Sequence, residues 1–162
     1  MAIAPQVGIV YYELQRATCN AERFGIYLDN LSIVLDDEPA FIIMDNAPAH
    51  SRAEMMNPEI HTIQKLPPYS PFLNPIEEVF SIVKAAIKAK LNDANIQRQL
   101  LNDRGHIDQQ VNLHEYRLGI LRGVAEDILD DREIVSVAKC VNINTRMMGY
   151  LPRCMDLVDI FH

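Results

Sequence analysis

The feature that most constrains this chain is a proline-rich segment near its middle, Leu66–Pro75 (LPPYSPFLNP). Its four prolines fix the backbone φ angle at their positions and remove amide donors that a helix or central strand needs. The residue before each proline is also driven towards an extended conformation. The segment therefore predicts a stiff, extended connector between the elements on either side of it.

Helices are predicted after the connector. Proline suits the first helical turn, and apolar residues then recur on one face of Ile76–Leu91 while three lysines lie elsewhere. Further along, the pattern remains helical: a short stretch at Asn95–Leu101, a longer one around Leu113–Leu129 and one near Arg132–Val141, followed by a short tail.

Strands and one helix alternate before the connector. Met1–Ala4 and Gly8–Leu14 are rich in β-branched and aromatic residues and predict two strands joined by a turn at Pro5. Asn20 can cap a helix that starts at Ala21, because apolar residues follow at three- and four-residue intervals. The remaining predictions are an apolar strand buried on both faces, a brief helical stretch and a further strand: Ala40–Met44, Arg52–Met56 and Ile60–Lys65.

This order of elements predicts an α/β protein, with a sheet layer in the first part and helices packed against it. The 162 residues suit one domain, in which residues 1–92 form the core and residues 93–162 a helical C-terminal extension packed on it. An RNase H-like sheet is compatible with the order, but the pattern alone does not single out that fold.

Composition limits the function classes. The formal net charge is −7, and acids outnumber bases on both sides of Asn92, which disfavours autonomous tight binding to DNA. A metal-dependent nuclease core remains compatible, because such a site concentrates carboxylates. Three widely spaced cysteines without a CxxC pair suggest neither a disulfide framework nor a zinc site. No signal-peptide pattern or membrane-length apolar run occurs, so we expect neither secretion nor membrane insertion.

Two acidic positions are candidates for chemistry. Asp45 follows the apolar strand, and the carboxyl ends of strands in α/β sheets face the crevice where ligands bind. Alternatively, Asp45 and Asn46 only open a turn. Glu77 and Glu78 lie in the first turn of the helix after the stiff connector, where a carboxylate could be presented in a fixed position. Acids in a first turn are also favoured simply by the helix dipole.

Taken together, these segments carry a resemblance. FIIMDNAPAHS followed by LPPYSPFLNPIEEVFSIVK resembles the second and third signature blocks of mariner-like and related insertion-sequence DDE transposases. The interval from Asp45 to Glu77 is 77 − 45 = 32 positions, slightly shorter than usual, and the likeness covers roughly residues 1 to 91. It implies an RNase H-like mixed sheet with flanking helices and three acids that hold two Mg²⁺ or Mn²⁺ ions for cleavage and strand transfer of DNA.

Carried over by position, the resemblance makes Asp45 the second acid and Glu77 the third, both catalytic and both metal ligands. Glu78 is then a solvated neighbour or a fallback ligand. Asn46 and His50 either orient the scissile phosphate or a water, or they cap the turn after the strand.

The first acid of the family pattern has no counterpart. It would lie on a strand upstream of the first hairpin, and no Asp or Glu precedes Glu13. Asp36, Asp37 and Glu38 come before the strand that ends at Asp45, so they belong at its opposite end. We therefore expect the sheet to lack its first strand, apolar surface to be exposed, and DNA cleavage by these residues alone to be weak or absent.

The leading hypothesis is a truncated DDE-type transposase catalytic domain that reaches DNA through upstream helix-turn-helix modules and can form a homodimer. Its location would be the nucleus in a eukaryote, or otherwise the cytoplasm and nucleoid. The alternative is a domesticated, non-catalytic interaction or nucleic-acid-binding module that keeps the same fold. An unrelated nucleotide-binding protein is disfavoured because neither GxGxxG nor GxxxxGK[ST] occurs.

Overall fold

The structure is a computed structural model, and it describes residues 1–36, 38–55, 59–68, 70, 73–101, 112–134, 136, 139 and 143. Contacts divide the chain into two compact units. The first comprises Met1–Glu78 with Val137–His162, and the second comprises Val79–Ser136. All of the candidate acids lie in the first unit.

The first unit begins with the expected hairpin. Strand β1 (Ala2–Ala4) pairs antiparallel with β2 (Gly8–Tyr11). Gly8 has a φ of 87°, which suits a residue without a side chain at the end of the turn. The second strand is shorter than predicted, because the chain leaves the ladder after Tyr11 instead of Leu14.

Helix α1 (Ala21–Leu35) starts where the sequence predicts. The Asn20 side chain accepts a hydrogen bond from the Arg23 amide at 2.9 Å, which satisfies one of the first-turn donors. The helix ends at Asp36, whose left-handed conformation (φ 51°) turns its amide back to the Ile33 carbonyl.

A parallel pair of strands follows. β3 (Phe41–Met44) pairs in register with β4 (Thr62–Lys65), and the 3₁₀ helix η1 (Pro48–Met55) lies between them in the chain. The prediction that the first of these strands is buried on both faces is wrong. Phe41 and Ile43 are 64% and 54% exposed, because only the alternate face packs against the core.

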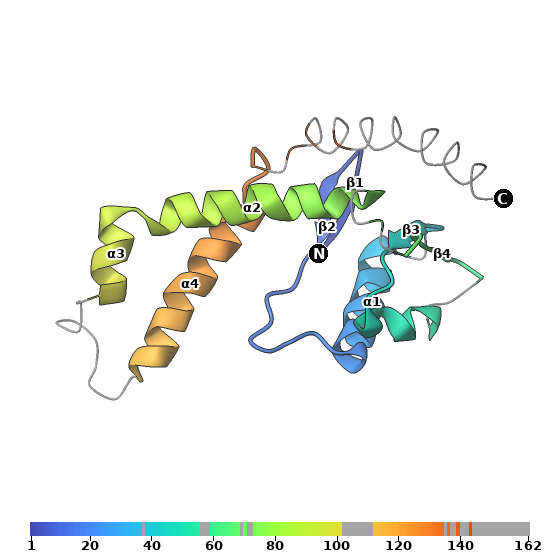
Figure 1. Ribbon diagram of the computed structural model, residues 1–162, viewed down its shortest axis with the longest axis horizontal. Coiled ribbons are helices and arrows are strands. Elements are labelled where there is room, and N and C mark those ends of the chain that lie inside the picture. Colours follow the sequence, from blue (N-terminus) through green and yellow to red (C-terminus); the bar gives the residue numbers. More distant parts are fainter. Residues whose placement is uncertain are drawn as a thin grey trace. The chain divides into compact units, whose positions relative to one another are not determined.

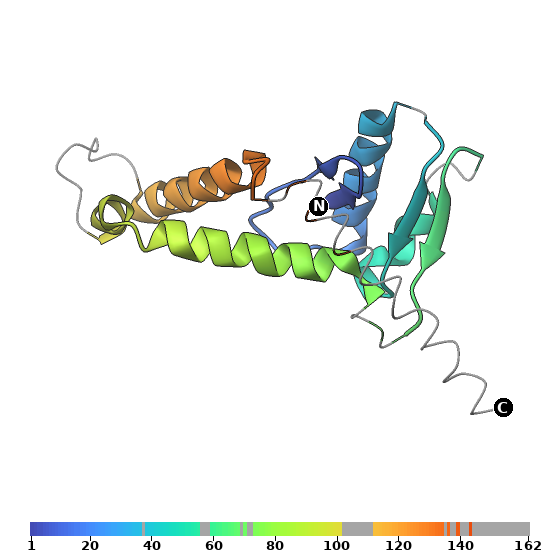
Figure 2. The ribbon, with the colours of Figure 1, turned by 90° about the horizontal axis from the view of Figure 1, so that it is seen from above.

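The core of the first unit forms where α1 packs on the inner face of β3 (Figures 1 and 2). Leu28 and Leu31 from the helix meet Met44 from the strand, and each is less than 9% exposed. Further apolar side chains from β2, β3 and β4 close the cluster around them, namely Val10, Ile42 and Ile63. This packing fixes the end of β3, and therefore the position of the residue that follows it.

Helices make up the second unit. It contains most of α2 (Pro75–Leu91), together with α3 (Ala94–Leu101) and α4 (Leu113–Asp130). The Arg117 side chain of α4 donates to the Leu100 carbonyl of α3 at 2.8 Å. Figures 1 and 2 show α4 returning towards α2. The predicted helix near Arg132–Val141 does not begin at Arg132, because Arg132–Ile134 form a turn. Most of the rest of that range lies outside the described residues.

The α/β class is confirmed, although the described strands form two separate two-stranded sheets and not one mixed sheet. The predicted C-terminal tail lies outside the described residues. The division near residue 92 stays a prediction. Among the helices that the structure describes, none combines the length and the hydropathy needed to cross a bilayer.

Candidate functional site

The turn after β3 holds Asp45 in a defined orientation. Its side-chain oxygen Oδ1 accepts a hydrogen bond from the Ala47 amide at 3.0 Å, which is an Asx turn. The side chain keeps 43% of its surface exposed. The carboxylate is therefore fixed by the backbone of its own turn and still open to solvent.

His50 gives the same carboxylate a second partner. Its Nδ1 lies 2.8 Å from Asp45 Oδ1 and 3.2 Å from the Asp45 backbone carbonyl oxygen. The His50 amide donates to the Ala47 carbonyl at 2.8 Å, which places the imidazole in the first turn of η1. Both contacts to the Asp45 side chain fall on Oδ1, so Oδ2 has no hydrogen-bond partner among the residues that the structure describes.

A series of aromatic rings leads from the hairpin to the His50 imidazole and contacts it. The centroid of the Phe24 ring lies 4.1 Å from that of His50, and Phe24 also stacks on Tyr27 at 5.9 Å. Tyr27 in turn lies 5.3 Å from Tyr11 on the hairpin. The sequence predicts only that apolar residues recur along this helix, and no local pattern signals the contact of Phe24 with His50.

Asn46 ties the turn to the neighbouring strand. Its side-chain amide donates to the backbone carbonyl of Leu66, the residue after β4. The Leu66 amide donates to the Met44 carbonyl at 2.8 Å and extends the parallel pairing. These bonds support the interpretation of Asn46 as a residue that stabilises the turn, and its role towards substrate stays a prediction.

The first turn of α2 presents its two acids differently. Asn74 caps the helix: it is only 8% exposed, and its Oδ1 accepts from the Ile76 amide at 3.4 Å. The Glu77 amide donates to the Asn74 carbonyl at 3.1 Å, whereas the Glu77 side chain is exposed and has no hydrogen bond or ion pair with the described residues. Glu78 is half-buried and interacts with other groups of the chain. Tyr69 of the connector lies outside the described residues.

Glu13, the first acid in the chain, sits in a saturated polar cluster. Its carboxylate accepts from Tyr11 Oη at 2.5 Å, from Asn30 Nδ2 at 2.9 Å and from Gln15 Nε2 at 3.2 Å. The Tyr11 hydrogen bond lowers the pKa of Glu13 below its ordinary value and raises the pKa of Tyr11. Burial raises the pKa of the neighbouring Tyr27. Glu13 therefore ties the hairpin to α1.

Other potential ligands are not gathered. His61 is only 2% exposed and its Nε2 lies 3.2 Å from Ser32 Oγ, while its buried Nδ1 has no hydrogen-bond partner. Across the described part of the chain, no three His, Cys, Asp or Glu side chains lie close enough to hold one metal ion. The site residues that are brought together are Asp45 and His50.

Comparison with known families gives one match. A family model described as DDE superfamily endonuclease covers residues 2–99, which is 99 − 2 + 1 = 98 of the 162 residues. The match runs from the hairpin through the Asp45 turn and the first turn of α2 into α3. Neither the curated proteins nor the solved structures contain a match to this chain.

Proposed function

The chain belongs to the DDE superfamily endonucleases, and from this premise we propose that it is the catalytic region of a mariner-like DNA transposase with an RNase H-like core. The family acts on DNA. The proposed reaction is metal-dependent hydrolysis of a phosphodiester bond, followed by transfer of the released 3′ end to a second DNA strand. The observation that carries the proposal is the Asp45 carboxylate, with one oxygen held by the protein and the other open.

Asp45 is proposed as the first cation ligand of this region. The Ala47 amide and His50 both contact Oδ1 of Asp45, which limits rotation of the carboxylate. The direction in which Oδ2 points is therefore restricted as well. An oxygen ligand held in this way suits Mg²⁺ or Mn²⁺, which prefer hard oxygen donors. Ordering of the ligand before binding also reduces the entropy cost of taking up the ion.

Glu77 is proposed as the second ligand. It follows a capped helix start, and the sequence predicts a stiff connector before that, so its backbone is positioned although its side chain makes no hydrogen bond with the described residues. Movement of the exposed carboxylate towards a cation costs little free energy, since it breaks no hydrogen bond with the described residues. Glu78 already has other contacts and serves as the fallback ligand.

The family implies a bound divalent metal ion. The residues present offer the right type of ligand, carboxylate oxygen, but fewer acids than the three that the family pattern has. Asp45 and Glu77 supply carboxylate oxygen donors, but among the described residues no three His, Cys, Asp or Glu side chains are grouped closely enough to hold one ion. A divalent ion bound there would supply Lewis-acid stabilisation of the charge that develops on the phosphate oxygens. His50 keeps Asp45 in place through the reaction, and Asn46 keeps the turn joined to the strand after β4. With two of three acids, we propose that this polypeptide cleaves DNA only slowly by itself.

Nicking of supercoiled plasmid tests the assignment. The wild-type chain, Asp45→Asn and Glu77→Gln would be incubated with Mn²⁺, with Mg²⁺ and with EDTA, and the rate of open-circle formation measured. We expect slow nicking that EDTA abolishes and that each substitution reduces at least about tenfold, because each removes a charged ligand. Glu78→Gln is the matched control and should retain most of the rate.

The same variants would also be compared in a chain extended by its upstream genomic sequence. Loss of activity in Asp45→Asn there would support the same assignment. Metal-dependent nicking that survives both substitutions would contradict it.

A non-catalytic interaction module is the alternative, and the lack of a three-ligand group among the described residues is the observation in its favour. In that case the extended chain would show no metal-dependent nicking under any condition, although it would remain folded. The comparison of the extended wild-type chain with and without Mn²⁺ separates the two proposals.

A further inference from the structure

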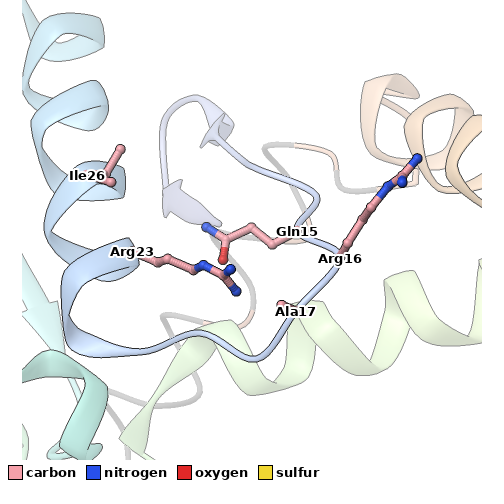
Figure 3. Close-up of a pocket in the computed structure, with 5 residues that line it drawn as sticks. All are labelled: Gln15, Arg16, Ala17, Arg23 and Ile26. Atoms are coloured by element: carbon pink, nitrogen blue, oxygen red, sulfur yellow. The ribbon is translucent and has the colours of Figure 1, made fainter.

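A small hollow lies between the loop after β2 and the first turns of α1 (Figure 3). Its volume is about 270 Å³, and it is lined by five residues, Gln15, Arg16, Ala17, Arg23 and Ile26. All five belong to the first unit, and none of them is among the proposed cation ligands. Two of the five are arginines, and none is acidic.

Arg23 is the side chain best placed to bind a ligand there. Figure 3 shows it extending from α1 towards the loop, with the Gln15 side chain opposite it. Its Nη1 donates to the Thr18 carbonyl at 3.1 Å, which holds the guanidinium across the mouth of the loop. That is its one hydrogen bond to the described residues, so the other N–H donors of the guanidinium remain available.

The surroundings favour an anion. Gln15 Nε2 donates to Glu13, whose two oxygens both accept hydrogen bonds, and the printed contact of the Arg23 guanidinium is to the Thr18 carbonyl and not to this acid. Arg16 makes its own contacts and extends away from Arg23 in Figure 3, yet its charge stays at the rim. In a chain with a net charge of −7, a hollow whose lining includes Arg23 and no acid is a place where an anion could be accommodated.

We propose that this hollow binds a phosphodiester group of duplex DNA, with Arg23 as the principal contact and Arg16 as a second, weaker one. The planar guanidinium fits two phosphate oxygens at once, and the hollow is large enough for one phosphate group with its water. The proposal rests on the proposed function, because it supplies a backbone contact for a DNA-processing chain outside the acid pair. It adds a positioning contact that carries no base specificity.

Salt-dependent binding without a divalent ion tests this directly. The dissociation constant of the chain for a short duplex of arbitrary sequence would be measured in EDTA from about 50 mM to about 200 mM KCl. Each phosphate contact contributes about 0.9 to the slope of log K against log salt, so one contact accounts for roughly a 3.5-fold loss of affinity over that range. We expect Arg23→Gln to reduce the slope by about 1, and the double variant with Arg16→Gln to reduce it further.

Controls separate this contact from net charge and from folding. Arg98→Gln on α3 removes the same charge at a site remote in the sequence and should leave the slope unchanged, whereas Arg23→Lys keeps the charge and should retain most of it. Thermal unfolding shows whether each variant is folded. Equal loss in Arg98→Gln, an unchanged slope in Arg23→Gln, or no salt-dependent binding at all would overturn the proposal.

Two further arms identify the source of the phosphate and isolate the proposal. Inorganic phosphate, added at constant ionic strength, should not displace the duplex, and displacement at equal concentrations of phosphate groups would refute DNA as the ligand. Failure of nicking with intact, Arg23-dependent binding would refute the proposed function alone, whereas nicking that is insensitive to Arg23 with an unchanged salt slope would refute this inference alone.

Discussion

Two carboxylates in the first unit, those of Glu13 and Asp45, differ in how their oxygens are hydrogen-bonded. The hairpin cluster surrounds Glu13 with three side-chain donors, so both of its oxygens are occupied. The turn after β3 gives Asp45 two donors on a single oxygen. A saturated carboxylate contributes to stability, whereas one that is oriented and half-satisfied can also bind a cation. The number of free oxygens, and not the presence of an acid, distinguishes the structural from the candidate catalytic residue.

The largest expected effect concerns cation affinity. Asp45→Asn should weaken Mn²⁺ binding, measured by isothermal titration calorimetry, at least about thirtyfold, or about 2 kcal/mol, because it removes the charged, open oxygen. Glu13→Gln should leave Mn²⁺ affinity unchanged, since its oxygens are already occupied. Equal losses of Mn²⁺ affinity in Asp45→Asn and Glu13→Gln would contradict the proposed difference between the two carboxylates.

A smaller effect is expected on stability, with the order of the two residues reversed. Glu13→Ala should lower the free energy of unfolding by about 1–2 kcal/mol, because it leaves Tyr11 and Asn30 without their shared acceptor. Urea denaturation measures this, and exposed Glu38→Ala is the matched control. If Asp45→Ala lowered the free energy of unfolding more than Glu13→Ala does, the hydrogen bonds of Glu13 would not be the more stabilising of the two sets.

His50→Ala should cost about 1 kcal/mol of unfolding free energy, since it removes a hydrogen bond to Asp45 and the ring contact with Phe24. Its Mn²⁺ affinity should fall less than that of Asp45→Asn, because the ligand remains but is less ordered. Exposed His114→Ala on α4 provides the control for loss of an imidazole. Unchanged stability and affinity in His50→Ala would show that Asp45 needs no support from it.

The smallest effect is a dependence on pH. The pKa of Glu13 is lower in the folded chain than its ordinary 4.5, so the folded state binds this proton less tightly than the unfolded state. The stability gained from this shift is present above the unfolded value and is lost as pH falls through the folded one. The difference in unfolding free energy between wild type and Glu13→Gln should therefore shrink as the pH is lowered from the ordinary pKa of 4.5 through the lower folded-state pKa. A constant difference over that interval would argue that the Glu13 hydrogen bonds do not depend on its charge.

Local features were predictable from the sequence and distant ones were not. The start of α1 at Ala21 follows from Asn20, because a cap acts on amides within three residues. The position of Asp45 at a strand end follows from the apolar run before it. The exposure of Phe41 did not follow, because an apolar pattern does not reveal how many layers cover a strand.

The contacts that orient the site depend on chain folding at long range. Phe24 and His50 are 50 − 24 = 26 positions apart, and no periodicity relates a helix residue to a later 3₁₀ turn. The partner of Asn46 is a backbone carbonyl, which any residue at position 66 would supply. Whether Glu77 approaches Asp45 upon binding a cation stays a prediction.

The parallel pairing of β3 with β4 also has a kinetic meaning. Met44 meets Lys65 only after the intervening chain has left the strand and returned, so the search for this pairing is slow compared with the winding of α1. The bond from Asn46 to Leu66 cannot form before that encounter. We therefore expect the turn that holds Asp45 to assemble after α1 during refolding, so that recovery of Mn²⁺ binding follows the recovery of helical signal.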